Sequence, residues 1–453
     1  MLTLDDFSHD QVQAVERLFE NDHTLLVAAM GAGKTVVSLT AIAELLDEGV
    51  LKRVLVVAPV KVCKNVWATE CDKWAQLKGV VEVADASGSN AGRRVAALRS
   101  SAQVVCINFE NLPWLFREFK AKEMFDGLVI DELTKLKNTG GAQFKAIRPR
   151  LKDFVWRVGM TGTPVSEDWT GLFGQMLIVD GGERLGTRKD GYLRKYFYPT
   201  DYNEYNWEMY AWAAEKIAGK IQEVVYTMPD YRDQLPQLSD ERVYVPLPPA
   251  LRLQYDELRR SLAVELGTTG VTVTADTAAI LSNKLQQCAS GFLYPSRTDE
   301  GQRGEAVYLS DYKLERARIE ISSILARGGA VIVCYWFAAD LERLLEMFPG
   351  SELNDKTIAE WNDGERDVLL LHPKSAGHGL NLYEGGADML WLGPIWSRDA
   401  RMQTIARIWR RGQNHKVRVK TLIGEGTVDE LVWDRAEGKE DHEILFRQHL
   451  MEG

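Results

Sequence analysis

The sequence predicts an α/β protein with two parallel-sheet lobes in tandem and a helical insertion between them. Short apolar runs occur in two separate series, helical patterns lie between the runs of each series, and the stretch between the series differs in composition. Buried strands that alternate with helices indicate a parallel sheet covered on both faces. A chain of 453 residues is also too long to fold around a single hydrophobic core of ordinary size, so two or three domains are expected.

The expected strands of the first series are TLLVAA (24–29), RVLVVAP (53–59), QVVCIN (103–108) and GLVIDE (127–132), with a helix over 35–49. Those of the second series are AVIVCYWF (330–337), DVLLLHP (367–373), ADMLWLG (387–393) and VRVKTLIG (417–424). Residues 185–300, between the series, are rich in Tyr, Trp, Arg and Glu at helical spacing. We therefore expect a first lobe over 1–240, with a helical protrusion at about 185–228, and a second lobe over 241–453, with a helical insertion at about 250–295.

Composition excludes several classes of protein. The net charge of −10 argues against a protein that coats nucleic acid by charge alone, although a basic groove on an acidic body remains open. The five cysteines form no CxxC pair, which predicts neither a disulfide framework nor a zinc site. The N-terminus lacks a signal pattern and no apolar run approaches the roughly 18 residues that span a bilayer, so a cytoplasmic protein without a membrane segment is expected.

The stretch MGAGKT, between an expected strand and an expected helix, predicts a phosphate-binding loop. Gly31 and Gly33 let the backbone approach phosphate without a Cβ in the way. Lys34 supplies a positive charge to the β- and γ-phosphates, and Thr35 a hydroxyl to Mg²⁺. The strict loop pattern fails at its first position, Ala28, but the strand–turn–helix context supports it. The expected ATP-binding residues of this loop are Met30, Gly31, Ala32, Gly33, Lys34 and Thr35.

Two adjacent carboxylates end the expected strand GLVIDE. A loop of this kind needs an acid that holds Mg²⁺ and, for hydrolysis, a carboxylate that orients or deprotonates water. We expect Asp131 to serve the metal and Glu132 the water. A glutamate here also favours hydrolysis over transfer of phosphate to a small substrate.

The stretch QTIARIWRRGQ (403–413) predicts a helix that ends at Gly412 and presents polar groups on one face. That face would carry Gln403, Arg407, Arg410 and Arg411. The other face would anchor the helix through Ile405, Ile408 and Trp409. The planar donors of arginine suit charge that is spread over phosphoryl oxygens. We expect Arg407 and Arg410 to reach the phosphate held by Lys34 from the second lobe, with Gln403 beside them and Arg411 in a solvent or backbone role.

Motifs that run in order along nearly the whole chain resemble those of the Swi/Snf ATPase family of superfamily-two helicase-like motors. They are DQVQAV (10–15), MGAGKT (30–35), VLVVAPVKVCKNVW (54–67), DELTKLKN (131–138), MTGTP (160–164), SAGHGLNL (375–382), QTIARIWRRGQ (403–413) and GTVDEL (426–431). The last three are the most specific for this family. Thr134 stands where the family has histidine, and Ala406 where it has aspartate.

The resemblance implies two RecA-like lobes that close on ATP and nucleic acid. It also implies that Thr161, Gly162, Thr163 and Gly379 couple hydrolysis to movement. Gln11 resembles the family's adenine-reading glutamine, but Ser8 to Gln11 also forms a capping box that would occupy the same side chain.

Several residues at expected strand ends are candidate contacts to the DNA backbone. They are Lys61, Lys64 and Asn108 in the first lobe, and Ser375, Asn381 and Trp396 in the second. Ordinary loop polarity is the alternative for the first three, and core packing is the alternative for Trp396. Arg398 is a further candidate phosphate contact, which the family pattern does not supply.

The resemblance implies a helicase-like ATP hydrolase that uses ATP and Mg²⁺ to move on double-stranded DNA. Such a motor remodels or displaces DNA-bound proteins without needing strand separation. One alternative is a strand-separating or branch-migrating helicase. Another, motivated by Thr134 and Ala406, is a catalytically weak DNA-binding module. A monomer of bacterial or viral source is expected, with target choice supplied by a protein partner or by DNA structure.

Overall fold

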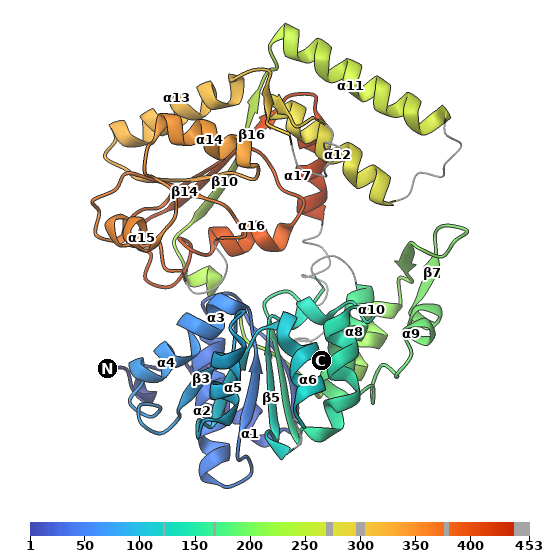
Figure 1. Ribbon diagram of the computed structural model, residues 1–453, viewed down its shortest axis with the longest axis vertical. Helices are drawn as coiled ribbons and strands as arrows, with labels where there is room; N and C mark the ends of the chain where they lie inside the picture. Colours follow the sequence, from blue (N-terminus) through green and yellow to red (C-terminus); the bar gives the residue numbers. More distant parts are fainter. Residues whose placement is uncertain (121–122, 166–168, 269–274, 296–303, 376–379, 439–453) are drawn as a thin grey trace. The chain divides into compact units, whose positions relative to one another are not determined.

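The computed structural model describes residues 1–120, 123–165, 169–268, 275–295, 304–375 and 380–438, and of these it gives no side chains for 262–281 and 436–438. The described chain divides into two compact units, Met1–Tyr231 and Arg232–Gly438. Each unit is built on one parallel sheet with helices around it, so the predicted α/β class with two parallel-sheet lobes in tandem is confirmed (Figure 1). The units meet along the chain between Tyr231 and Arg232, ahead of the predicted boundary at residue 240.

The first unit contains a seven-stranded sheet of order β3-β4-β2-β5-β6-β1-β9, in which all neighbouring strands are parallel. Its strands are β1 (His23–Val27), β2 (Val54–Val57), β3 (Val83–Asp85), β4 (Val104–Ile107), β5 (Gly127–Asp131), β6 (Trp156–Thr161) and β9 (Val225–Thr227). The predicted strands form the centre of this sheet, because each contributes an apolar run that is buried on both faces.

The helices of the first unit are α1 (His9–Glu20), α2 (Lys34–Asp47), α3 (Val60–Asn65), α4 (Trp67–Lys73), α5 (Ala91–Arg99), α6 (Leu112–Glu118), α7 (Ala142–Ile147) and α8 (Leu172–Asp180). All nine residues of α8 are buried, including the polar Gln175 and Asp180, and the other seven are apolar or glycine. Short 3₁₀ helices follow β5 (η4, Leu133–Leu136) and α7 (η5, Arg148–Asp153). The region predicted as a protrusion holds α9 (Lys189–Tyr196), an antiparallel hairpin of β7 (Phe197–Pro199) and β8 (Trp207–Met209), and α10 (Ala213–Ile221).

The second unit contains a five-stranded parallel sheet of order β10-β16-β15-β13-β14. Its strands are β10 (Leu238–Val245), β13 (Val331–Cys334), β14 (Val368–Leu371), β15 (Asp388–Trp391) and β16 (Val417–Gly424). Strand β10 was not predicted. It lies at the edge of the sheet, and its centre consists of three exposed, charged residues (Asp240, Glu241 and Arg242), so it lacks the apolar run that identifies a central strand.

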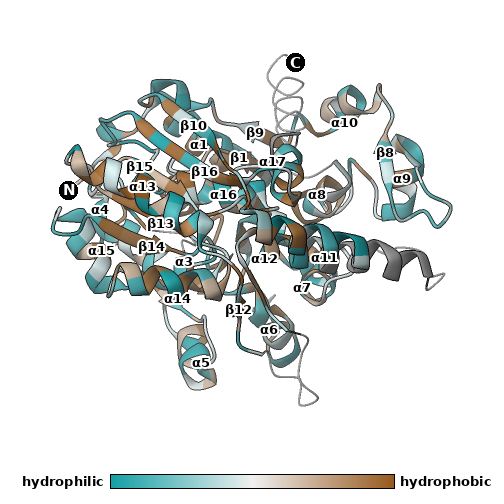
Figure 2. Ribbon diagram, turned by 90° about the horizontal axis from the view of Figure 1, so that it is seen from above, coloured by the Kyte–Doolittle hydropathy of each residue, from teal (hydrophilic) through white to brown (hydrophobic). Residues whose placement is uncertain are grey.

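The helices of the second unit are α11 (Pro249–Thr268), α12 (Ala275–Ala289), α13 (Tyr312–Ala326), α14 (Ala338–Met347), α15 (Asp355–Asn362), α16 (Arg398–Ile405) and α17 (Val428–Gly438). A small hairpin of β11 (Phe292–Leu293) and β12 (Val307–Tyr308) follows α12. Figure 2 shows hydrophobic colour along the sheet strands, whereas helices such as α5 and α15 carry both colours. No described helix is long and apolar enough to cross a membrane.

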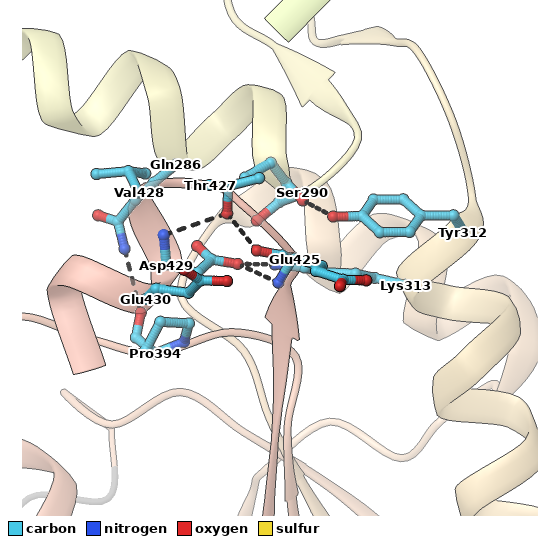
Figure 3. Close-up of polar contacts among 12 residues, drawn as sticks. Gln286, Ser290, Tyr312, Lys313, Pro394, Glu425, Thr427, Val428, Asp429 and Glu430 are labelled. Atoms are coloured by element: carbon cyan, nitrogen blue, oxygen red, sulfur yellow. Dashed lines mark hydrogen bonds and ion pairs between the residues drawn. The ribbon is translucent and has the colours of Figure 1, made fainter. Parts of the chain in front are cut away.

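A buried ion pair ties the GTVDEL stretch to the rest of the second unit (Figure 3). The ammonium of Lys313, at the start of α13, lies 2.5 Å from Oδ2 of Asp429 in α17, and the two side chains are only 4% and 2% exposed. The same carboxylate oxygen accepts the backbone N–H of Gly424 at the end of β16 (2.9 Å). The hydroxyl of Thr427 donates to the carbonyl of Gly424 (2.7 Å). Asp429 therefore joins α13, β16 and α17 at one point.

Lys313→Met is expected to destabilise the second unit by about 3–5 kcal/mol, because it leaves the Asp429 carboxylate buried without a compensating charge. The double variant Lys313→Met/Asp429→Asn should recover part of this loss, because asparagine keeps an acceptor for Gly424. Urea unfolding of the single and the double variant measures both changes in the free energy of unfolding. Lys356→Met is the matched control: its partner Glu360 lies 3.6 Å away and Lys356 is 84% exposed, so a loss below about 1 kcal/mol is expected. Equal losses for Lys313 and Lys356 would contradict a structural role for the buried pair.

Candidate functional site

Three predicted motifs lie at the carboxyl ends of three adjacent strands. In the sheet of the first unit, β6 lies between β5 and β1, with Asp131 paired to Met160 and Val27 paired to Thr161. The backbone N–H of Ala28 continues this pairing by donating to the carbonyl of Thr161 (3.0 Å). Since parallel strands end at the same edge, MGAGKT, the Asp131–Glu132 pair and the MTGTP stretch meet there.

The predicted phosphate loop has the backbone that such a loop requires. Gly31 and Gly33 have φ of 78° and 87°, a left-handed conformation that favours glycine. The helix α2 begins at Lys34, so its free N–H groups and partial positive charge face the loop. The ammonium of Lys34 donates to the carbonyls of Ala28 (2.8 Å) and Ala29 (3.2 Å). These bonds hold the ammonium within the turn that would receive phosphate.

Gln11 serves the capping box and also contacts the loop. Its Oε1 accepts the N–H of Ser8 (2.9 Å), so the predicted capping box is confirmed. Its Nε2 donates to the carbonyl of Ala32 (3.1 Å), and a Cβ added at Gly33 would lie 2.2 Å from this nitrogen. The amide therefore joins the start of α1 to the phosphate loop. An amide has two donor hydrogens and two acceptor lone pairs, so one of each is left for the adenine contact that the resemblance implies.

Tyr231 is a contact to the loop that the sequence analysis missed. Its hydroxyl donates to the carbonyl of Met30, and the side chain is 3% exposed. The segment that carries it follows β9, whose pairing with β1 extends to a bond from Met228 N–H to the carbonyl of Val27 (2.9 Å). The sequence gives no local sign of this contact, because the two residues lie about two hundred positions apart in the chain.

The carboxylates of Asp131 and Glu132 lie at the end of β5, and both residues are 7% exposed. Glu132 has φ 64° and ψ 56°, a left-handed conformation that costs a non-glycine residue on the order of 1–3 kcal/mol. Thr161, completely buried, accepts the N–H of Thr163 through its hydroxyl (3.2 Å), which shapes the turn through Gly162. A carboxylate and a hydroxyl are oxygen donors that Mg²⁺ accepts beside substrate phosphates, so Asp131 and Thr35 fit that ion.

Cys63, in α3, is not a nucleophile of this site. It is 1% exposed, and its Sγ lies 3.5 Å from the carbonyl of Ala58. Burial, with the nearby charges of Asp85 and Asp131, holds the pKa of this thiol well above its usual range, so the reactive thiolate does not form near neutral pH.

The structure separates the three DNA-contact candidates of the first unit. Lys61 and Lys64 lie on α3, after β2, and both are exposed. Asn108 follows β4 but is 5% exposed, and its amide is occupied: Oδ1 accepts from Gly88 N–H (3.1 Å) and Asn111 Nδ2 (2.6 Å), and Nδ2 donates to Glu110 (2.6 Å). These bonds give Asn108 a structural role in holding the loop. The two lysines stay predicted contacts to the DNA backbone.

The candidates of the second unit follow the carboxyl ends of β14 and β15. Ser375 is half-buried in the turn after β14, and Asn381 is exposed. The indole N–H of Trp396 donates to Oε1 of Gln286 in α12 (2.8 Å), which supports the packing alternative for this half-buried ring. Arg398 begins α16. Gly379 lies outside the described residues.

His372 holds the turn before Ser375. Its Nδ1 accepts the N–H of Lys374 (3.1 Å), so Nε2 carries the proton and donates to the carbonyl of Trp336 (3.1 Å). Burial lowers the pKa of His372, which keeps the ring neutral and this arrangement intact at neutral pH.

The prediction of one helix through the arginines is wrong. Helix α16 ends at Ile405, and Arg407, Arg410 and Arg411 lie in the turns that follow. After Ile405 the backbone changes to bonds between residues three apart: the N–H of Arg407 donates to the carbonyl of Thr404 (3.1 Å) and that of Ile408 to the carbonyl of Ile405 (3.0 Å), while the carbonyl of Arg407 accepts the N–H of Leu382 (3.1 Å). The predicted anchors are confirmed, because Ile405 and Ile408 are completely buried and the indole of Trp409 donates to the carbonyl of Pro236 (2.9 Å). Gln403 remains within α16.

The arginine turns pack on the stretch that follows SAGHG. Nη1 of Arg407 donates to the carbonyl of Leu380 (3.4 Å), and Arg407 is 7% exposed. Gln413 fixes the end of the segment, since its Nε2 donates to the carbonyls of Tyr383 (3.1 Å) and Gly386 (3.2 Å). Nε of Arg410 is buried and has no hydrogen-bond partner among the described residues. The arginine turns therefore pack against Leu380 and Leu382, the described end of the SAGHGLNL stretch.

Similar proteins are known from phage and from eukaryotes. Protein p41 of Acyrthosiphon pisum secondary endosymbiont phage 1 is 31% identical over 447 residues, which cover 94% of each chain. The DNA repair and recombination protein RAD54 of Oryza sativa subsp. japonica is 24% identical, and the match covers 95% of this chain and 49% of the rice protein. The chain thus spans about half the length of that relative.

A solved structure and a family model also match. The Sulfolobus solfataricus SWI2/SNF2 ATPase core in complex with dsDNA aligns with 98% of this chain and 96% of its own, at 20% identity and a TM-score of 0.44. The model of the SNF2-related domain matches residues 10–290. This match over more than half of the chain, together with the identity to the phage protein, shows that the chain belongs to the SNF2-related family.

Proposed function

We propose that this protein is an ATP- and Mg²⁺-dependent motor that moves along double-stranded DNA and displaces or remodels proteins bound to it. The observation that carries the proposal is the convergence of MGAGKT, Asp131–Glu132 and MTGTP at the ends of β1, β5 and β6. Membership of the SNF2-related family supports it. The relative named for DNA repair and recombination supports DNA as the partner.

Each residue of the first unit has one role in this proposal. Lys34 and the N–H groups of the glycine turn hold the β- and γ-phosphates, and Gln11 holds the turn and reads adenine. Asp131 and Thr35 hold Mg²⁺, which neutralises charge that develops on the phosphates. Glu132 orients the attacking water and accepts its proton. Thr161, Gly162 and Thr163 transmit hydrolysis to the rest of the motor, because the MTGTP turn adjoins the phosphate loop through β6 and β1.

The second unit supplies the arginines in this proposal. Arg407 and Arg410 stabilise charge on the γ-phosphoryl group when the lobes close on ATP, with Gln403 beside them and Gly379 coupling closure to DNA movement. Lys61, Lys64, Ser375, Asn381 and Arg398 contact the DNA backbone. The motor is a monomer that works in the cytoplasm of a bacterial cell, and a protein partner or DNA structure selects its target.

The test of the proposal is the ATPase rate with duplex DNA, single-stranded DNA and RNA measured side by side. Duplex DNA is expected to stimulate hydrolysis most, and a third strand paired to a duplex is expected to be displaced without separation of the duplex strands. Release of a labelled strand from a partial duplex would favour the strand-separating alternative instead. Absence of any DNA-stimulated hydrolysis would favour the weak DNA-binding module, which Thr134 and Ala406 motivate.

A further inference from the structure

The first unit has a basic pocket at the end of the sheet opposite to the phosphate loop. The pocket measures about 310 Å³. Arg148 and Lys152 from η5 line it, together with Arg157 from β6 and the loop residues Gly181 and Thr187. Arg157 lies four residues before Thr161 in β6, a distance of about 13 Å along the strand. The pocket is therefore separate from the ATP site.

The floor of the pocket carries a buried guanidinium with unused donors. Arg157 is 6% exposed, and its one side-chain hydrogen bond among the described residues runs from Nη1 to the carbonyl of Leu151 (3.3 Å). Its Nε is buried and has no hydrogen-bond partner among the described residues. Burial lowers the pKa of Arg157, which is the direction expected for a charge that lacks full compensation. Buried arginines are usually paired, and Arg157 lines the pocket with a single side-chain bond among the described residues, which suggests a ligand for its other N–H groups.

The carboxylate of Asp180 does not neutralise the charge of Arg157 by a direct ion pair. Asp180, beside the pocket, partly opposes the effect of burial on Arg157. Its own oxygens accept the N–H groups of Gly182 (2.7 Å) and Arg184 (3.2 Å), and no ion pair with Arg157 forms within 4 Å among the described residues. None of the described residues that line the pocket is acidic.

The rim adds further positive charge to an acidic protein. Arg148 and Lys152 are exposed at the rim, and Arg148 is oriented by a bond from its Nη2 to the carbonyl of Thr187 (2.9 Å). Residues 145–157 carry five basic side chains and a single acid, Asp153, in a chain of net charge −10. Such a local excess of one sign raises the concentration of anions at the pocket.

We propose that this pocket binds the terminal phosphate of a small molecule. Three cations favour a ligand with more than one negative charge over a monocarboxylate, and the planar donors of Arg157 match phosphate oxygens. A terminal phosphate carries only one ester group, so it can reach the buried Arg157. A phosphate of duplex DNA carries a second ester group, which would keep it away from this residue. The site is independent of the proposed motor activity, since none of its residues belongs to the ATP site.

Titration calorimetry with inorganic phosphate at constant ionic strength tests the proposal. The rim variants Lys152→Gln and Arg148→Gln are used, because the buried Arg157 also contributes to the fold. Each is expected to weaken phosphate binding roughly tenfold or more, the effect of losing one charged hydrogen bond. Lys34→Ala should retain binding at the pocket, and Lys78→Gln, an exposed lysine elsewhere in the unit, should bind as the unsubstituted protein does.

Three results would overturn the proposal. They are no phosphate binding at all, binding that disappears in Lys34→Ala, and binding that is unchanged in both rim variants. A titration with duplex DNA tests whether the pocket binds the phosphate of a small molecule or that of the DNA backbone. A loss of duplex affinity in Lys152→Gln, with a shallower salt dependence, would make this surface a contact to the DNA backbone instead. DNA-stimulated ATP hydrolysis of Lys152→Gln in phosphate-free buffer is expected to stay unchanged, so failure of this inference and failure of the proposed function can be told apart.

Discussion

Replacing both Arg407 and Arg410 with alanine is expected to lower the rate of DNA-stimulated ATP hydrolysis by roughly 10³-fold or more, the range in which arginines of this type act in other NTPases. The reason is that the charge of the γ-phosphoryl group spreads over three oxygens as it is transferred, and guanidinium donors stabilise that charge. Arg410 keeps a buried nitrogen without a partner among the described residues, which is consistent with donor capacity reserved for a ligand.

The measurement is the steady-state ATPase rate with saturating duplex DNA, combined with an assay of nucleotide binding. Nucleotide binding should survive, because Lys34 and the glycine turn belong to the other unit. Arg411→Ala is the matched control from the same turns and should lose little activity. Since Arg407 is 7% exposed, thermal unfolding is used to check that the double variant folds. An unchanged hydrolysis rate in a folded double variant would refute the two-lobe mechanism.

Lys34→Ala is expected to reduce both nucleotide binding and hydrolysis, the latter by on the order of 10² to 10³-fold or more, as for the loss of one preorganised charged donor. The ammonium is already held in the turn by the carbonyls of Ala28 and Ala29, so it needs little reorganisation to meet phosphate. The loss of binding distinguishes this variant from the arginine variant, which should lose hydrolysis alone.

A filter-binding assay with labelled ATP and the ATPase rate measure the two effects of Lys34→Ala. Lys78→Ala, an exposed lysine in the same unit, is the control and should behave as the unsubstituted protein does. DNA-stimulated hydrolysis that persists in Lys34→Ala would mean that the glycine turn is not the phosphate site.

Strands with a clear apolar run could be predicted from the sequence, including β14 at one edge of the second sheet, whereas the central strand β6 and the edge strands β3, β9 and β10 were not predicted. The apolar runs of β1, β2, β4 and β5 are buried on both faces, so their signal does not depend on neighbours. The edge strands β3 and β10 are partly exposed and carry charged residues, which is how edges avoid pairing with other chains. Their strand character arises only from the neighbour that they pair with.

In the candidate site, too, features that depend on local sequence could be predicted and features that depend on distant contacts could not. Gly31, Gly33 and Lys34 could be recognised because a glycine turn between a strand and a helix is a local pattern. The helix through Arg407 was predicted wrongly for the opposite reason. Helical spacing is local, but the residues after Ile405 also bond to a distant segment, since the carbonyl of Arg407 accepts the N–H of Leu382.

The sequence by itself determined the class of fold, the order of the motifs and the chemistry of the phosphate loop, because apolar periodicity and short motifs are properties of neighbouring residues. Only the tertiary structure decided which polar groups are already occupied. The sequence left the amides of Gln11 and Asn108 with more than one possible role each, and in the structure one bonds the phosphate loop and the other a structural turn. The same holds for Arg157, whose open donors appear only once η5, β6 and the loop after α8 come together around it. Hydrogen bonding and burial depend on partners that are distant in the chain, and folding alone brings those partners together.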